Sequence, residues 1–203
     1  MPADRAQPLG VVLAGGRSRR LGGAKASAEL CGRPLISYPI AALAAVLDEV
    51  AVVAKGDTGL PPLHGCTVWI EREIGHHPLF GLAEALARGG GRAVVVCALD
   101  LPLVSPELVR RLITEEPRAV ALIAASGGDQ QPLLGRYQPS VAERLRAAAE
   151  RREPVRAAVA ALGARMLEVR DPDALLNVNT PADMRRAQAV LSRRSQTWSG
   201  RAG

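Results

Sequence analysis

Two glycine pairs, three arginines and a lysine follow the first apolar run of this chain. The run ends at Gly15 and Gly16, and the segment continues through Arg20 to Lys25. Glycines at the end of a strand let backbone N–H groups approach an anion closely, and arginine and lysine add full positive charge. These residue types in this order predict a phosphate cradle, and hence a protein that uses a nucleotide.

The spacing differs from the two commonest glycine motifs. Lys25 lies between two alanines, whereas the lysine of a P-loop follows glycine and precedes serine or threonine. These glycines do not form the Gly-x-Gly-x-x-Gly fingerprint of dinucleotide-binding proteins either. An ordinary turn with solvated arginines also contains glycine pairs, so the spacing alone leaves the cradle and the turn open.

A lone carboxylate follows a second apolar run. Residues 93–98 show no polar alternation, which is typical of a central strand, and Asp100 comes two residues later. Open α/β sheets bind ligands beyond the carboxyl ends of their strands, so Asp100 faces the cradle if the two strands are neighbours. A carboxylate beside a triphosphate needs a cation, which predicts Mg²⁺ at Asp100. A turn-capping role before Pro102 is the alternative.

Two asparagines form a third polar element. Asn177 and Asn179 are two residues apart on an extended segment, so their side chains point the same way. Thr180 opens the last helix, with Asp183 at the capping-box position. Neutral amides can bind a phosphate or a metal-bound oxygen without adding negative charge, while turn chemistry before a helix is the alternative.

The elements that must position these residues alternate along the chain. Apolar β-rich runs alternate with Ala- and Leu-rich helical segments, as in a parallel α/β sheet. Strands are expected at 9–14, 49–54, 67–71, 93–98, 119–124, 133–137 and 165–169. Helices are expected near 37–47, 80–88, 106–115, 139–151, 154–162 and 181–191. The pattern predicts one α/β domain over residues 8–191 and a flexible tail at 192–203.

Composition narrows the class of ligand. The net charge of +6 suits an anionic ligand, whereas an aromatic content of 2% disfavours base stacking on nucleic acid. No apolar stretch reaches the length of a membrane span, and the N-terminus lacks a signal-peptide pattern. Cys31, Cys66 and Cys97 are expected to be buried free thiols in a reducing cytosol.

Three motifs together resemble a known family. Leu-Ala-Gly-Gly-x-Ser-x-Arg-Leu-Gly-x-x-Lys at 13–25, Leu-Asp-Leu-Pro at 99–102 and Asn-Val-Asn-Thr-Pro at 177–181 resemble the molybdenum cofactor guanylyltransferases of the nucleotidyltransferase superfamily. The resemblance implies a three-layer sandwich with a mostly parallel, Rossmann-like sheet. It implies transfer of GMP from GTP to the terminal phosphate of molybdopterin, with Mg²⁺ as cofactor and pyrophosphate as by-product. It also implies a cytoplasmic protein that works with molybdoenzyme chaperones or a companion molybdopterin-guanine dinucleotide protein.

The resemblance also assigns roles to residues. The nucleotide is expected at Leu13, Ala14, Gly15, Gly16, Lys25, Val53, Glu71 and Asp100. The expected catalytic residues are Arg20, Lys25 and Asp100, and Asp100 is the metal ligand. Asn177, Asn179 and Gln131 are expected on the side of the second substrate. The chain departs from the family pattern at Ala24 and Val53, where relatives carry an acidic residue and a base-contacting asparagine.

Other functions stay open. A related transferase could use CTP on molybdopterin, or GTP on a phospholactate-like acid. A catalytically silent nucleotide-binding regulator is a further alternative, which the departures at Ala24 and Val53 favour. The arginines of the segment 144–156 could receive the phosphate of the pterin or form a solvated helix face.

Overall fold

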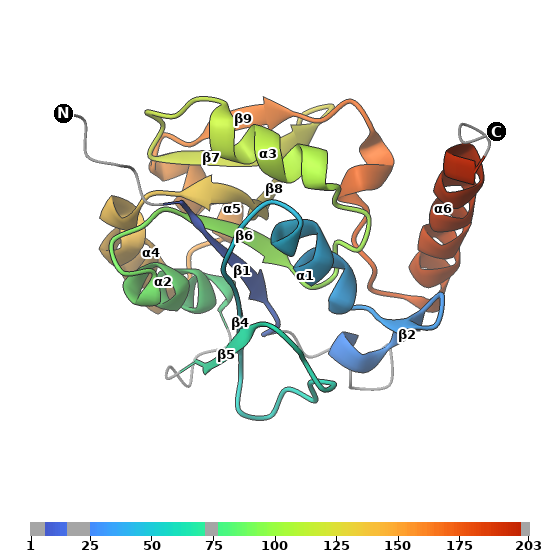
Figure 1. The fold of residues 1–203 in the computed structure, drawn as a ribbon. Coiled ribbons are helices and arrows are strands. Elements are labelled where there is room, and N and C mark those ends of the chain that lie inside the picture. Colours follow the sequence, from blue (N-terminus) through green and yellow to red (C-terminus); the bar gives the residue numbers. More distant parts are fainter. Residues whose placement is uncertain (1–6, 16–24, 72–76, 200–203) are drawn as a thin grey trace.

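One central sheet organises the molecule (Figure 1). The structure is a computed structural model that describes residues 7–15, 25–71 and 77–199. Within these residues seven strands form one sheet in the order β5-β4-β1-β6-β8-β7-β9. They are β1 Leu9–Leu13, β4 Val50–Ala54, β5 Thr67–Ile70, β6 Val94–Ala98, β7 Ala121–Ser126, β8 Asp129–Tyr137 and β9 Arg165–Glu168. All neighbouring strands are parallel except at β8, which is antiparallel to both β6 and β7.

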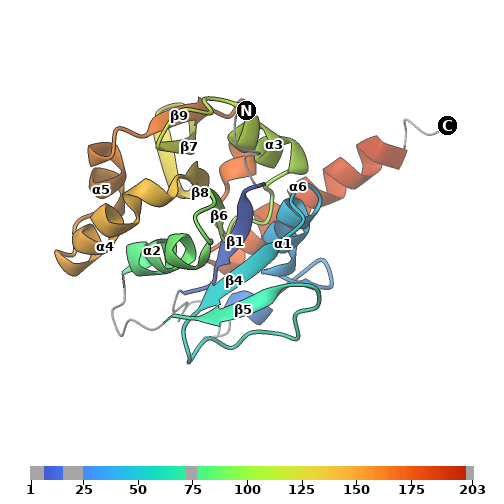
Figure 2. The same cartoon turned by 60° about the vertical axis from the view of Figure 1, so that its left-hand side comes forward.

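Helices cover both faces of this sheet, which makes three layers (Figure 2). The α-helices are α1 Ser37–Ala44, α2 Pro78–Arg88, α3 Pro106–Thr114, α4 Ala142–Glu150, α5 Val155–Ala161 and α6 Pro181–Ser199. Short 3₁₀ turns lie at η2 Lys25–Ser27, η3 Pro139–Val141 and η4 Pro172–Leu175, and a small ribbon pairs β2 Glu29–Leu30 with β3 Arg33–Pro34. Alternate residues of β1 enter opposite cores: Val12 packs on the side of α1 and α3, and Val11 on the side of α2 and α4. The predicted three-layer α/β class is confirmed.

The strand β8 departs from the expected course of the chain. It begins at Asp129, whereas a strand was expected from 133, because the polar residues before Pro132 lack an apolar strand pattern. Gly127 and Gly128 form the two-residue turn that leads into it, and both have a positive φ, which glycine adopts without strain. This tight hairpin makes β8 antiparallel to β7.

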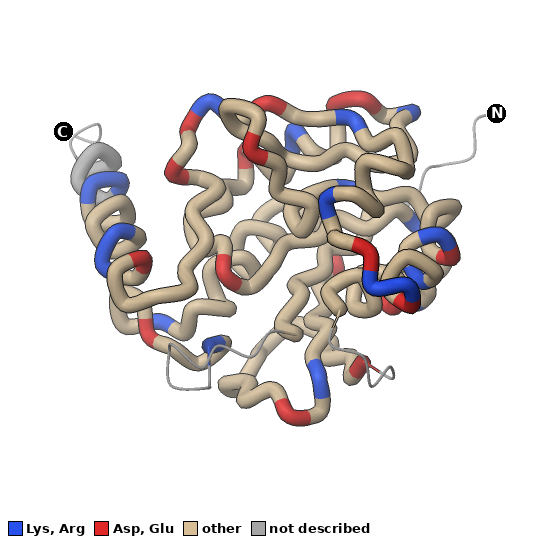
Figure 3. The backbone as a smooth tube through the Cα atoms, turned by 180° about the vertical axis from the view of Figure 1, so that it is seen from behind, with Lys and Arg blue, Asp and Glu red and all other residues tan. Residues whose placement is uncertain are grey.

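The last helix is longer than predicted. Helix α6 continues to Ser199, beyond the expected end at 191, so at least residues 192–199 are helical rather than an irregular tail. The prediction relied on the loss of apolar periodicity, but polar contacts hold this part of the helix. Arg194 donates to the carbonyl oxygen of Leu103 at 2.9 Å and to Asp171 at 2.8 Å. Figure 3 shows basic and acidic residues intermixed along the described chain, α6 included.

The cysteines differ from one another in exposure. Cys97 is buried as expected, Cys66 is half-buried, and Cys31 is exposed, which contradicts the expectation of three buried thiols. Cys31 lies at the turn between β2 and β3, where a short ribbon offers no apolar layer to cover it. Within the described residues, no helix combines the length and the apolar character that a membrane crossing requires.

Candidate active site

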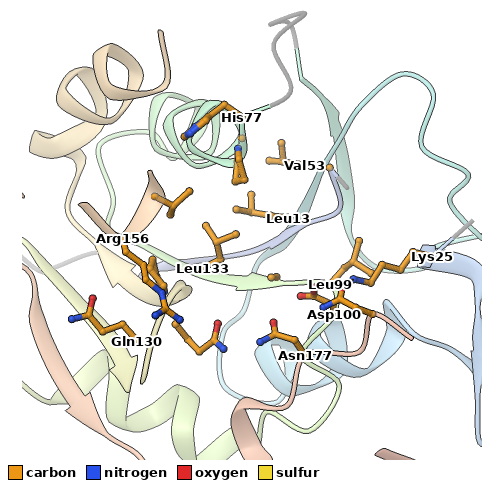
Figure 4. A pocket seen from close by; sticks show the side chains of 18 of the residues that line it. Leu13, Lys25, Val53, His77, Leu99, Asp100, Gln130, Leu133, Arg156 and Asn177 are labelled. Atoms are coloured by element: carbon orange, nitrogen blue, oxygen red, sulfur yellow. Dashed lines mark hydrogen bonds and ion pairs between the residues drawn. The ribbon is translucent and has the colours of Figure 1, made fainter. Parts of the chain in front are cut away.

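Side chains from the three sequence motifs, those that follow β1 and β6 and the asparagine segment, lie close together (Figure 4). The ammonium Nζ of Lys25 lies 2.9 Å from Oδ2 of Asp100 and 2.6 Å from Oδ1 of Asn179. Lys25 is 7% exposed, so its charge is largely removed from water and is compensated by these two oxygens. Residues 25, 100 and 179, far apart in the sequence, therefore form one polar cluster, as predicted.

Neighbouring parallel strands bring this cluster together. Strand β6 lies directly beside β1, so the residues that follow the two strands share one edge of the sheet. The amide of Leu99 donates to the carbonyl oxygen of Leu13 at 3.1 Å, which continues the pairing one residue beyond β6. The amide of Val178 in turn donates to the carbonyl oxygen of Asp100 at 2.9 Å and draws the asparagine segment against the same edge.

A capping box holds Asn179 toward Lys25. The carboxylate of Asp183 accepts hydrogen bonds from the amide of Asn179 at 3.0 Å and from the amide of Thr180 at 2.8 Å. The amide of Asp183 donates to the hydroxyl oxygen of Thr180, which completes the predicted box at the start of α6. The hydrogen bond from the Asn179 backbone, followed by the one from the Thr180 side chain, lowers the pKa of the Asp183 carboxyl below its ordinary value.

A cavity of about 940 Å³ opens in front of the cluster. Most of the residues predicted for the site line it, namely Leu13, Gly15, Lys25, Val53, Glu71, Asp100, Gln131, Asn177 and Asn179. Ala14 does not line the cavity: its side chain is buried, and its amide donates to the carbonyl oxygen of Val53 at 2.8 Å. Gly16 and Arg20 lie outside the described residues, so their predicted roles stay predictions.

At one end of the cavity, the lining carboxylate of Glu71 forms an ion pair with the half-buried Lys55 behind it. Lys55 and Glu71 directly follow the neighbouring strands β4 and β5, and Nζ of Lys55 lies 3.4 Å from Oε2 of Glu71. A Cβ atom at Gly81 would lie 3.5 Å from Leu13 and 3.8 Å from Oε2 of Glu71. The bare backbone of Gly81 on α2 thus leaves a narrow slot between an apolar side chain and the carboxylate.

The other end of the cavity is formed by the start of β8 and by α5. Asp129, Gln130 and Gln131 line it together with Val155 and Arg156. The register of β8 against β7 shifts between Ile123 and Ala124, opposite the Pro132 region of β8. A proline cannot donate to the ladder, which accounts for an irregular register at this point of β8.

Lys55 and Asp129 had no predicted role, whereas the segment 77–82, with His77 and Gly81, was expected by resemblance near the nucleotide base, and both of these residues line the cavity. A charged residue directly after a buried strand is the signal that could have found Lys55, since the same signal found Asp100. His77 directly precedes α2, and its Nδ1 accepts a hydrogen bond from the amide of Leu79 in the first turn of this helix. The other ring nitrogen, Nε2, lies 2.9 Å from the carbonyl oxygen of Glu153, which ties α2 to the segment before α5.

The cavity offers phosphate chemistry rather than nucleophilic catalysis by a thiol. Burial, with a smaller contribution from Asp100, raises the pKa of the Cys97 thiol, which therefore stays protonated. Within the described residues, no group of three or more His, Cys, Asp or Glu side chains could hold a metal ion by itself. A cation here would need a further ligand, such as a phosphate group of a bound nucleotide.

A mostly parallel sheet with a charged cavity at the carboxyl ends of its strands is the architecture of the nucleotide-binding α/β proteins. Within this class, the chain belongs to the family of MobA-like NTP transferase domains, whose family model matches residues 10–171. This membership confirms the predicted superfamily.

Named relatives extend over nearly the whole chain. The molybdenum cofactor guanylyltransferase of Cereibacter sphaeroides is 36% identical over 196 residues, covering 90% of this chain and 96% of the relative. That of Rhodobacter capsulatus is 36% identical over 189 residues, covering 90% and 95%. The solved molybdopterin-guanine dinucleotide biosynthesis protein A of Archaeoglobus fulgidus has the same fold, with a TM-score of 0.75 at 24% identity, covering 91% of this chain and 99% of that one.

Proposed function

We propose that this protein transfers GMP from GTP to the terminal phosphate of molybdopterin and releases pyrophosphate. The names of its relatives indicate this activity. The observation in this structure that supports it best is the cluster of Lys25, Asp100 and Asn179 at the wall of a large cavity. The cluster combines a phosphate-binding cation with a metal-binding carboxylate at the edge of the sheet where nucleotides bind.

The reaction needs no general base. An oxygen of the acceptor phosphate forms a bond to the α-phosphorus of GTP, and the bond from that phosphorus to the bridging oxygen breaks. The leaving pyrophosphate takes the electron pair. A phosphate monoester is largely a dianion at neutral pH, since its second pKa is about 6, so no proton must be removed from the attacking oxygen. Catalysis instead requires two anions to be aligned and their repulsion to be reduced.

Lys25 supplies charge where this repulsion arises. In the structure its ammonium donates to the carboxylate of Asp100 and to the amide oxygen of Asn179. When a triphosphate enters, Lys25 donates to it and stabilises the negative charge that develops on pyrophosphate. Asn179, held by its capping box, remains a neutral partner that adds no repulsion.

The residues of the cavity fit Mg²⁺ that arrives with the nucleotide. The carboxylate of Asp100 faces the cavity and already has a cation 2.9 Å away, which shows that this site stabilises positive charge. Asp100 would hold the ion, and the amide oxygens of Asn177 and Asn179 are hard ligands of the kind that it prefers. Bound there, Mg²⁺ would act as a Lewis acid that reduces the negative charge of the phosphate groups.

The cavity is large for a ligand pocket. Its volume of about 940 Å³ lies near the upper end of the usual range of roughly 300–1,000 Å³. The slot at Gly81 and Glu71 would take the base of the nucleotide. Gln131 and Asn177, at the far side, would then contact the acceptor. Delivery of the product to chaperones or a companion protein, and a cytoplasmic location, stay predictions of the resemblance.

Replacing Glu71 with glutamine is expected to reduce the preference for GTP over CTP at least about 10-fold. Guanine presents two adjacent N–H donors, which one carboxylate can accept together, whereas cytosine presents one. A hydrogen bond to a charged group contributes about 1.5–3 kcal/mol, so its loss should be measurable. Titration calorimetry with Mg-GTP and Mg-CTP gives the ratio of the two affinities.

The matched control for this variant is Glu84→Gln. Glu84 is also a buried carboxylate in an ion pair, with Arg88 at 2.7 Å, but it does not line the cavity. The control should lose stability without losing base preference. A wild-type ratio in Glu71→Gln, with stability lowered in both variants, would assign Glu71 to the fold alone.

The direct test of the proposed function is incubation with Mg-GTP and molybdopterin, followed by detection of the dinucleotide product and pyrophosphate. Formation of both supports the proposal. Product from Mg-CTP only, or from GTP and a phospholactate-like acid only, would assign the chain to a related transferase. Stabilisation by Mg-GTP without pyrophosphate release from any acceptor would identify a nucleotide-binding regulator.

A further inference from the structure

We propose that Asp129 and Arg156 form a subsite for the hydrogen-bonding edge of the acceptor's pterin ring. The carboxylate and the guanidinium form an ion pair at the end of the cavity opposite Lys55 and Glu71. The proposal rests on the proposed function, because the acceptor is a pterin only if the chain uses molybdopterin.

Asp129 is held in place by a tight hairpin. It is the first residue of β8 and pairs with Ser126 across the two-glycine turn. The amide of Gly127 in this turn donates to Oε1 of Glu168 at 2.9 Å, which attaches the tip of the hairpin to β9. The carboxylate of Asp129 therefore projects from an anchored part of the sheet.

Arg156 comes from a separate element, whose start is also held by a contact with another part of the chain. It lies on α5, and the preceding segment is tied to the start of α2 by the contact of His77 with the carbonyl oxygen of Glu153, at 2.9 Å. Figure 4 shows Arg156 directed toward the strand that carries Gln130. Two independently fixed elements thus bring one cation and one carboxylate to the same end of the cavity.

The exposure of this pair leaves both of its charged groups accessible from the cavity. The side chains of Arg156 and Asp129 are 61% and 66% exposed. An exposed ion pair of this kind contributes little to stability because water screens it. Both groups remain accessible to a ligand that enters the cavity, and such a ligand would displace the water around them.

The chemistry of the pair favours a neutral ring over a phosphate group. A phosphate near Arg156 would also meet the negative charge of Asp129. A pterin carries a 2-amino-4-oxo pyrimidine edge, on which adjacent N–H donors lie next to a carbonyl acceptor. The carboxylate can accept from the donors while the guanidinium donates to the carbonyl oxygen.

The two ends of the cavity resemble each other, because a carboxylate with a neighbouring cation lies at each of them. Guanine has the same order of groups on its edge as a pterin, an amino group, a ring N–H and a carbonyl oxygen. A carboxylate lines each end of the cavity, Glu71 with Lys55 behind it and Asp129 with Arg156 beside it. The proposed product is a dinucleotide with this edge at both ends. The arrangement therefore fits one ring in each end and the reacting phosphates between them, near Lys25.

The test compares two fluorescent probes, 6-hydroxymethylpterin and 6-hydroxymethyl-lumazine. Lumazine has a carbonyl oxygen in place of the 2-amino group, so the carboxylate of Asp129 would repel it. Fluorescence titration of the full chain should show at least about a 10-fold preference for the pterin. Asp129→Asn should reduce this preference to about 2-fold or less, because an amide can donate to the lumazine carbonyl. Arg156→Gln should weaken pterin binding about 10-fold.

The matched control is Arg151→Gln. Arg151 is equally exposed at 61% and pairs with Glu153, but it does not line the cavity, so the variant should bind both probes like the wild type. An unchanged preference in Asp129→Asn, or no preference in the wild type, overturns the proposal. Displacement of the pterin by inorganic phosphate that depends on Arg156 would also overturn it, in favour of a phosphate site.

These outcomes separate the subsite from the proposed function. Pterin preference that depends on Asp129, without GMP transfer to molybdopterin, would support the subsite and contradict the function. GMP transfer with a KM for molybdopterin that Asp129→Asn leaves unchanged would support the function and contradict the subsite. If the subsite and the proposed function are both correct, Asp129→Asn raises the KM for molybdopterin about 10-fold, while the KM for GTP stays within about 2-fold of the wild-type value.

Discussion

Asp100→Asn is expected to lower kcat for pyrophosphate release at least about 100-fold, since losing one preorganised charge-stabilising group costs about 10²–10³ in rate. The asparagine keeps the size of the side chain and an oxygen that can accept from Lys25. It removes the negative charge that is proposed to hold Mg²⁺. The loss should therefore appear in the dependence of the rate on Mg²⁺, measured at saturating GTP and molybdopterin.

A carboxylate outside the cavity provides the control for this variant. Asp173 also forms an ion pair, with Arg186 at 2.7 Å, and Asp173→Asn should keep wild-type turnover. Thermal unfolding of both variants shows whether the chain remains folded. Near-wild-type turnover and Mg²⁺ dependence in a folded Asp100→Asn protein would remove Asp100 from the proposed mechanism.

Lys25→Met is expected to raise the KM for GTP about 10-fold and to lower kcat about 100-fold. Methionine occupies much of the same buried volume but cannot donate to a phosphate group. Because the proposed role of Lys25 extends to the charge that develops on pyrophosphate, both constants should change. Steady-state kinetics with GTP as the varied substrate measures them.

A double-mutant cycle separates the catalytic role of Lys25 from its structural one. In the nucleotide-free protein, Lys25→Met leaves the partly buried carboxylate of Asp100 without its ammonium partner. The loss in free energy of unfolding should shrink when Asp100 is already asparagine, with a coupling of about 1–3 kcal/mol. Additive losses, together with wild-type kinetics in Lys25→Met, would contradict both roles.

In the proposed mechanism, Lys25 and Asp100 exchange partners when the nucleotide binds. Each group satisfies the charge of the other in the structure, at 2.9 Å. In the complex, Lys25 would instead donate to phosphate and Asp100 would hold the ion that accompanies it. The buried charges are thus compensated both with and without the nucleotide, which lets the chain keep a cation and a carboxylate in its core.

Much of the site could be predicted from the sequence because the relevant signals are local. An apolar run without alternation predicts a buried strand, and parallel α/β order sends every such strand toward the same edge of the sheet. Those two facts were enough to expect Asp100 near the cradle that ends at Lys25, whereas Asn179 was linked to this site by its amide chemistry and by the resemblance. The capping box at Thr180 and Asp183 was equally local, since its partners are three residues apart.

Other features depended on the tertiary structure. Lys55 and Glu71 are 16 positions apart and Asp129 and Arg156 are 27 apart, so no local period links the members of either pair. They meet because β4 lies beside β5 and because the hairpin at Gly127 places β8 next to α5. The sequence by itself determined which residues end the strands, and hence the edge of the sheet that carries the chemistry. Only the tertiary structure decided which side chains face each other across the cavity, because strand order and the antiparallel course of β8 depend on packing between distant segments.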